Sequence, residues 1–254
     1  MVETIQSYRI CIGFFGFIRS YITKEQFTAF KSLLPKEATV DIVISCPDTL
    51  GELDTTSSRD DIYKNLNDVF DGHTLTVNLY SYNPKPFIAR QIELGLPPLS
   101  QKTNMHTYRI LSLHNSISEL CKRIHGYDTV LLTRFDIFSS ISNLGTMVDM
   151  ALHDSIYIWR TIPYESCEDA EDRIIISSQK GIDILSKLYD SAKEHLHIYS
   201  GDSLNSEVCI GKYLSLFTDL IKYKQSSLSI GLSPYVNAKY ESGFISKINS
   251  LLES

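Results

Sequence analysis

Short apolar runs alternate with longer amphipathic segments along most of the chain. Apolar runs rich in β-branched residues are typical of buried strands, whereas apolar residues at three- and four-residue steps are typical of helices. We therefore predict strands at residues 8–15, 40–46, 74–80, 127–136, 155–161, 174–177 and 228–232. Because helical segments separate most of these runs, the fold class that we expect is α/β, with a mostly parallel sheet flanked by helices.

Capping signals mark the starts of two predicted helices. The sequence T-K-E-Q at residues 23–26 has the form of a capping box, and the helix behind it ends at Pro35. Ser58 precedes a second helix, which ends near residue 70. The longest helical pattern covers residues 103–125, with Gly126 as its C-cap. Further helices are expected at about residues 143–152 and 179–196, from residue 201 through Glu207, and at the C-terminus.

The composition argues against several classes of protein. A formal net charge of -6 does not suit nonspecific binding of nucleic acid, which needs a basic surface. No run approaches the roughly 20 apolar residues of a membrane span, and the apolar segment 10–18 lies between two arginines, unlike a signal peptide. The five cysteines are scattered without a C-x-x-C pair, which favours reduced thiols over structural zinc. We therefore expect a cytoplasmic protein.

Charged residues end the apolar strand at residues 127–136. A charge is costly inside a core, so Arg134 and Asp136 are expected at the carboxyl end of this strand. In an open α/β sheet, ligands bind at that edge. An arginine can bind phosphate through two hydrogen bonds, and a carboxylate can hold Mg²⁺ or Mn²⁺ beside a diphosphate. The strand therefore predicts a phosphate site.

The end of the first strand fits the same prediction. Gly13 and Gly16 enclose two phenylalanines, and Arg19 follows shortly after. Glycine lets a ligand approach the backbone closely, although a plain turn between strand and helix explains the pair equally well. Asp48, just beyond the second strand, has two similar interpretations: contact with a nucleotide ribose, or the turn chemistry of a Pro-Asp pair.

Other catalytic motifs are missing from the sequence. There is no Walker A sequence, no G-x-S-x-G and no H-x-x-x-H, and His195-x-His197 alone is too little for a zinc site.

The strand and its charged end resemble a family signature. Tyr127-Asp128, the apolar strand and Arg134-Phe135-Asp136 are similar to the Y-D-x-V-x-x-x-R-x-D signature of a group of GT-A-type glycosyltransferases. Bacterial surface-polysaccharide loci and large DNA viruses encode such proteins. Segments 12–19, 40–45, 171–176 and 205–207 resemble, in the same order, its strand-Gly-x-x-Arg element, its second strand, its D-D-R-F-I segment and its H-P-E motif. Two departures are Ser206 in place of proline and Arg134 in place of the first acid of D-x-D.

This resemblance implies a GT-A-like fold over residues 1–254, with a nucleotide-binding half at 1–136 and an acceptor-side half at 137–254. The implied activity is transfer of a hexose or pentose from a nucleotide-diphosphate sugar, with UDP-sugar favoured, to a glycan acceptor in glycoprotein or surface-polysaccharide synthesis. The location would be the cytoplasm, or the host cytoplasm if the protein is viral. One alternative is a non-catalytic nucleotide-sugar or carbohydrate-binding protein on the same fold. Another is a nucleotidyltransferase.

The resemblance also implies roles for individual residues. Asp136 would hold Mn²⁺ or Mg²⁺, although Arg134 could neutralise the diphosphate directly and make the metal optional. Asp172 or Glu207 would accept the proton of the acceptor hydroxyl, with Asp202 and Glu168 in reserve. A plain helix-terminus charge also explains Glu207, and a helix-surface role is the main alternative for Tyr108 and Arg109. The expected contacts with the nucleotide sugar are Gly13, Phe14, Phe15, Gly16, Arg19, Tyr108, Arg109, Arg134 and Asp136.

Overall fold

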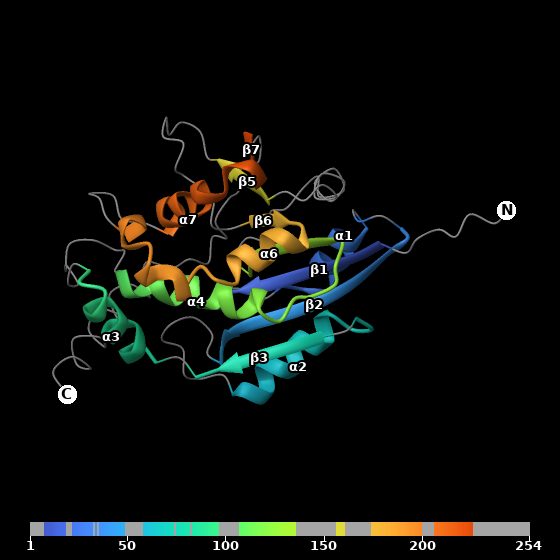
Figure 1. Ribbon diagram of the computed structural model, residues 1–254. Coiled ribbons are helices and arrows are strands. Elements are labelled where there is room, and N and C mark those ends of the chain that lie inside the picture. The colour runs from blue at the N-terminus through green and yellow to red at the C-terminus, as the bar shows by residue number, and fades with distance from the viewer. Residues whose placement is uncertain are drawn as a thin grey trace.

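The computed structural model describes residues 8–18, 22–32, 34, 36–48, 58–73, 75–81, 83–96, 107–135, 156–160, 174–199 and 206–225. Within these residues, seven strands form one sheet in the order β3-β2-β1-β4-β6-β5-β7 (Figure 1). The strands are β1 Tyr8–Phe15, β2 Ala38–Pro47, β3 Leu75–Tyr80, β4 Thr129–Arg134, β5 Ile156–Arg160, β6 Ile174–Ser177 and β7 Ile221–Gln225. The α-helices are α1 Lys24–Lys31, α2 Arg59–Val69, α3 Lys85–Glu93, α4 Thr107–Cys121, α6 Gln179–Leu185 and α7 Ser206–Leu214. The described residues also form the short 3-10 helices η2 Asp190–Lys193, η3 Leu196–Tyr199 and η4 Ser215–Leu220.

The sheet is mostly parallel, as expected. Strand β1 pairs in parallel with both β2 and β4, β2 pairs in parallel with β3, and β5 pairs in parallel with β7. Strand β6 runs antiparallel to both of its neighbours, β4 and β5. The α/β class is therefore confirmed, and the reversal of β6 is a feature that the apolar pattern did not predict. A fully buried run of four residues has the same pattern in either direction.

Helices cover both faces of the sheet, and each face has its own apolar core. Alternate residues of β1 point to opposite faces, with Phe14 in one cluster and Phe15 in the other. Helices α1 and α2 pack on the Phe14 face, whereas α4, α6 and α7 pack on the Phe15 face. The arrowheads of β1 and β3 point to the same side of the molecule in Figure 1, so their carboxyl ends lie along one edge.

The predicted caps of the first two helices are confirmed. Thr23 and Gln26 form the reciprocal capping box at the start of α1, and the Ser58 side chain accepts a hydrogen bond from the Asp61 N–H at the start of α2. Gly126 has a positive φ of 76°, but its predicted role as the C-cap of the helix is wrong. Helix α4 ends at Cys121, and four residues lie between this end and Gly126.

The predicted long helix at residues 179–196 is wrong. Helix α6 ends at Leu185, and two 3-10 helices follow. The Ser118 hydroxyl of α4 donates to the Leu185 carbonyl at 3.2 Å and accepts from the Tyr189 N–H at 3.0 Å. These two backbone groups would bond to each other in a continuous α-helix, so the inserted hydroxyl interrupts the helix.

Some predicted elements lie outside the described residues. These are the helix at 143–152, the strand at 228–232 and the C-terminal helix. In contrast, β7 is a described strand that the sequence did not predict. None of the helices in the described ranges has the length and apolar character needed to cross a membrane. Four cysteines within those ranges are free and buried: Cys11, Cys46, Cys121 and Cys209.

Candidate functional site

The carboxyl ends of β1 and β4 lie side by side. The register pairs Phe15, the last residue of β1, with Arg134, the last residue of β4. Gly16 follows Phe15 directly, and Arg134 is half-buried. The structure therefore brings together two of the predicted ligand-binding positions, Gly16 and Arg134, which are more than a hundred residues apart in the sequence.

Gly16 forms a turn that depends on glycine. Its φ of 76° lies in the left-handed region, which other residues rarely adopt. Among the described residues, a Cβ atom there would meet the Leu113 side chain at an ordinary distance of 3.8 Å, so the backbone conformation favours glycine. The Gly16 N–H donates to the Ser116 hydroxyl at 3.1 Å. The turn after β1 is therefore held from α4.

The aromatic residues between the two glycines are part of the core. The Phe14 ring stacks on Phe135 with a centroid distance of 4.7 Å, and it also lies 5.5 Å from the Phe70 ring. Phe15 is completely buried on the opposite face of the sheet. With both side chains packed, a ligand at this edge would meet the backbone of the two residues and not their rings. Their predicted contact with the nucleotide sugar remains a prediction.

Gly13 has a structural role that the sequence did not suggest. A Cβ atom on Gly13 would lie 2.8 Å from a Leu132 methyl group, 3.0 Å from Leu120 and 3.2 Å from Ile124. These residues belong to β4, to α4 and to the turn after α4. The missing side chain thus lets α4 and β4 pack closely on β1.

Tyr108 and Arg109 lie in the first turn of α4. Tyr108 is fully buried, whereas Arg109 is half-buried. Helix α4 precedes β4 in the chain and packs on β1 and β2. The contact of Tyr108 and Arg109 with the nucleotide base stays a prediction, and burial of the Tyr108 ring favours a role in packing.

Several predicted site residues lie outside the described part of the chain. These are Arg19, Asp136, Glu168, Asp172 and Asp202. Glu207 is the second residue of α7, and its side chain is likewise not described. The predicted roles of these residues in metal binding and catalysis stay predictions.

A buried histidine connects α4 with the 3-10 helix η3. The His114 ring nitrogen Nδ1 lies 3.0 Å from the Tyr199 hydroxyl. Burial lowers the pKa of His114 to about 3, so the ring is neutral; the nearby Ser206 backbone opposes this shift. Because Ser206 is the first residue of α7, the helix that carries Glu207 begins near a neutral ring.

The two ends of the family signature lie at opposite ends of strand β4. The Tyr127 hydroxyl donates to Asp41 Oδ2 at 2.9 Å, and the Arg9 guanidinium lies 4.7 Å from the centre of the Tyr127 ring. Arg9 also contacts Asp41 Oδ2 at 3.2 Å, and its N–H donates to Asp128 Oδ2 at 2.8 Å. This cluster lies at the amino ends of the strands. Tyr127 and Asp128 thus join strands together, far from Arg134.

Polar groups join the ends of β2 and β3 beside this edge. The Asp48 N–H donates to the Tyr80 carbonyl at 2.9 Å, and Asp48 Oδ2 accepts from the Ser81 hydroxyl at 3.1 Å. Asp48 therefore joins the ends of two strands, which supports the turn interpretation of this residue.

Ser116, which binds the Gly16 N–H, was not predicted as a partner of the site. It gave no signal in the sequence, because a serine in an amphipathic helix is usually an ordinary surface residue.

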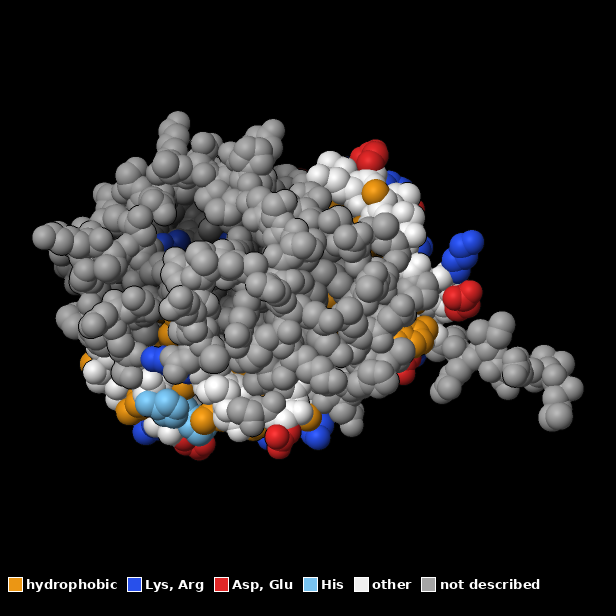
Figure 2. Space-filling view, turned by 90° about the horizontal axis from the view of Figure 1, so that it is seen from above, with side chains coloured by type: hydrophobic (Ala, Val, Ile, Leu, Met, Phe, Trp, Pro, Cys, Tyr) orange, Lys and Arg blue, Asp and Glu red, His pale blue; other side chains and the backbone are white. Residues whose placement is uncertain are grey.

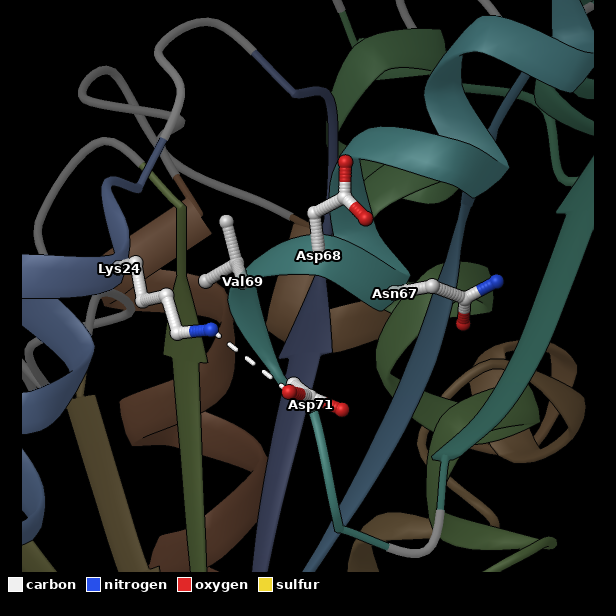
Figure 3. A pocket seen from close by; sticks show the side chains of 5 residues that line it. All are labelled: Lys24, Asn67, Asp68, Val69 and Asp71. Carbon is white, nitrogen blue, oxygen red and sulfur yellow. Dashed lines mark ion pairs between the residues drawn. The ribbon is translucent and has the colours of Figure 1, made fainter.

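A pocket on the surface lies apart from the candidate site. A pocket of about 480 Å³ is lined by Lys24, Asn67, Asp68, Val69 and Asp71 (Figure 3). Its Lys24–Asp71 ion pair, at 3.6 Å, is exposed on both sides and contributes little stability. Asp71 precedes β3, which puts this pocket at the amino end of that strand.

Histidine side chains gather beside basic and apolar ones on the face seen in Figure 2. The rings of His195 and His197 have centroids 5.9 Å apart. Among the residues that the structure describes, no three His, Cys, Asp or Glu side chains come together as metal ligands. The His-x-His pair therefore remains too small for a zinc site.

No family model matches the chain, and no curated protein matches it in sequence. Several solved structures are similar to it at low identity. Mouse xyloside xylosyltransferase 1, in its apo form, is 11% identical with a TM-score of 0.43, over 85% of this chain and 84% of that chain. An active-site mutant of the galactosyltransferase LgtC is 12% identical with a TM-score of 0.49, over 91% and 81%. HddC from Yersinia pseudotuberculosis is 12% identical with a TM-score of 0.46, over 93% and 99%.

Proposed function

We propose that the chain is a glycosyltransferase with a GT-A-like fold, which moves a sugar from a nucleotide-diphosphate sugar, in first place a UDP-sugar, to a glycan hydroxyl. One observation carries the proposal. The register pairs Phe15 with Arg134 and Thr133 with Ile174. The Gly16 turn, the charged end of β4 and the start of the reversed strand β6 therefore meet at one edge. In α/β sheets, this is the edge that binds ligands.

Chain connectivity supports the assignment of two acids to this edge. Asp136 follows the buried Phe135 directly, so their Cα atoms are about 3.8 Å apart. Asp172 precedes Ile174 by two residues, which limits the separation of their Cα atoms to about 7 Å. Because Ile174 lies opposite Thr133, chain connectivity supports the assignment of Asp136 and Asp172 to the edge that carries Arg134. An arginine suits the diphosphate of the donor, and a carboxylate suits the acceptor hydroxyl.

The donor set fits a divalent metal only together with substrate oxygens. Asp136 is the one acid that the motif offers beside Arg134, so phosphate oxygens of the donor would complete the coordination of Mn²⁺ or Mg²⁺. Such an ion, when bound, stabilises negative charge on the leaving diphosphate. Arg134 supplies a similar stabilisation from the protein, because its guanidinium can bind two phosphate oxygens at once.

The proposed reaction needs charge stabilisation and one proton acceptor. The bond between the anomeric carbon and the diphosphate breaks while the carbon gains oxocarbenium character, and the acceptor oxygen forms the new bond. Arg134 stabilises the charge that develops on the leaving group. The proton of the acceptor hydroxyl passes to a carboxylate, for which Asp172 is the first candidate and Glu207 the second.

Thermal unfolding in the presence of sugar nucleotides tests the proposal. We expect at least one member of a panel of UDP- and GDP-sugars to raise the melting temperature, because a ligand at a hundred times its Kd adds about 2.7 kcal/mol to the stability. A panel without any stabilising member contradicts the proposal. Stabilisation without hydrolysis of the donor and without transfer to any acceptor would instead favour the non-catalytic binding protein.

Two variants of the same motif test the metal. Asp136→Asn should lose the part of the stabilisation that depends on Mn²⁺, because an amide is a weaker metal ligand than a carboxylate. Asp128→Asn is the matched control: it makes the same substitution in the same motif, but at the amino edge, where Asp128 accepts from the Arg9 N–H. An unchanged Mn²⁺ response in Asp136→Asn excludes Asp136 as the metal ligand.

A further inference from the structure

The Ser116 hydroxyl bridges the ends of β1 and β2. Its oxygen accepts from the Gly16 N–H at 3.1 Å and donates to the Ser45 carbonyl at 3.2 Å. Ser116 is 2% exposed, so water cannot easily replace either bond. The hydroxyl therefore fixes the turn after β1 to the neighbouring strand.

The two contacts use different positions of the Ser116 hydroxyl. A serine hydroxyl has one donor and two acceptor positions. The Ser45 carbonyl takes the donor, and the Gly16 N–H takes one acceptor position. Ser116 of α4 therefore connects the end of β1 with β2 through a single group.

Glycine needs such an external contact to keep one conformation. It has no Cβ to restrict its dihedral angles, so a turn at Gly16 with a φ of 76° is one of several accessible shapes. We propose that Ser116 is a positioning residue for the donor: its hydroxyl holds the Gly16 turn in the shape that accepts the diphosphate of the nucleotide sugar. This inference rests on the proposed function, because it concerns the same edge of the sheet.

Ser118 provides a matched control on the same helix. It is fully buried, and its hydroxyl also bridges a backbone carbonyl, that of Leu185 at 3.2 Å, and a backbone N–H, that of Tyr189 at 3.0 Å. The chemistry and the burial match those of Ser116. The partners differ, because Ser118 binds the end of α6 and not the candidate site.

Calorimetric titration with UDP and with GDP, each in the presence of Mn²⁺, separates the two serines. Loss of the Gly16 contact in Ser116→Ala should weaken nucleotide binding about tenfold, equivalent to about 1.4 kcal/mol. Ser118→Ala should lower the melting temperature about as much as Ser116→Ala does. Unlike Ser116→Ala, it should leave the nucleotide affinity unchanged. Wild-type affinity in Ser116→Ala, or an equal loss in both variants, overturns the positioning role.

The outcomes also separate this inference from the proposed function. A wild-type protein that binds neither nucleotide contradicts the proposed function itself, and the inference with it. A wild-type protein that binds, with Ser116→Ala binding equally well, overturns the inference alone. If Ser116→Ala does not fold, Ser116→Cys is measured by the same criteria, because a thiol has nearly the same shape but forms weaker hydrogen bonds.

Discussion

At the scale of single residues, Gly13 in β1 and Gly16 directly after it show two different reasons for the same residue type. Gly13 gives room to the Leu132 and Leu120 side chains, which a Cβ atom would meet at 2.8 Å and 3.0 Å. Gly16 supplies a positive φ, and a Cβ atom there would make only ordinary contact with Leu113 among the described residues. The sequence presents both as a pair after a strand, and only the neighbours of each residue distinguish packing from a turn. Gly16 is therefore the better candidate for contact with a ligand.

Single substitutions distinguish the two candidate proton acceptors, Asp172 and Glu207. We expect Asp172→Asn to retain binding of the donor but lose at least about a hundredfold in transfer rate, since an amide cannot accept the proton. Glu207→Gln should then keep most of the activity. Donor affinity is measured by titration and transfer by release of the nucleotide diphosphate. Retained transfer in Asp172→Asn together with loss in Glu207→Gln would assign the base to Glu207.

At the scale of elements, β4 carries the signature but divides it between two edges. Its amino end lies next to Tyr127, which contacts Asp41 and Arg9, whereas its carboxyl end, Arg134, lies beside Gly16. At about 3.3 Å per residue, the two ends of the signature are on the order of 20 Å apart. Residues of one motif therefore have separate roles: one end stabilises the sheet and the other faces the candidate site.

A substitution at Tyr127 tests this division. Tyr127→Phe removes the hydrogen bond to Asp41, which is largely buried, but keeps the ring under the Arg9 guanidinium. We expect the free energy of unfolding to fall by roughly 1 to 2 kcal/mol, because the lost bond has a carboxylate acceptor. Denaturant unfolding measures this change. Nucleotide affinity should stay at the wild-type value, and a large loss of affinity would show that the two edges are coupled.

Helix α4 carries the buried His114, which makes the stability of the protein depend on pH. The pKa of His114 in the folded protein is about 3, against about 6.5 in an unfolded chain. Between these two values the unfolded state binds the extra proton. The contribution of His114 to stability is therefore complete above about pH 6.5, and it is lost as the pH falls towards 3.

Unfolding in urea at several pH values measures this contribution. Below about pH 6, His114 should contribute a slope of about 1.4 kcal/mol per pH unit to the free energy of unfolding. His114→Asn keeps a hydrogen-bonding group near the Tyr199 hydroxyl but does not titrate, so its pH profile should be flatter by that slope. Parallel profiles for the variant and the wild type would contradict the assignment.

At the scale of the whole molecule, the reversed strand β6 joins the two halves of the chain. It pairs with β4 from the first half and with β5 from the second. The core on the α4 side mixes both halves as well, since Leu120 and Leu132 share one cluster with Ile175 and Ile210. On this face, residues of both halves form one apolar core.

This mixing predicts one cooperative unfolding transition. In differential scanning calorimetry, the ratio of the calorimetric to the van't Hoff enthalpy should be close to one. A fragment of residues 1–136 should show no cooperative transition, because it lacks β6, α6 and α7, which cover β4 and α4. Two separate transitions in the full chain, or a fragment that unfolds cooperatively, would contradict this expectation.

Local patterns of the sequence determined most of the elements. Apolar runs located six of the seven described strands, and the caps at Thr23 and Ser58 located two helix starts. The charged end of β4 indicated which edge to examine, and Gly16 was part of that prediction. These features depend on neighbouring residues, on helix and strand periods and on the cost of burying charge, all of which a single sequence contains.

The tertiary structure alone decided the direction of β6, the end of α6 and the partners of the candidate site. Ser118 interrupts α6 from 67 residues away, and Ser116 holds Gly16 across a separation of 100 residues. Tyr127 contacts Asp41 across 86 residues. A hydroxyl has no sequence signature for its distant hydrogen-bond partner, because that partner is fixed only once the helices pack on the sheet. Short-range patterns therefore located the elements, and long-range packing assigned their contacts.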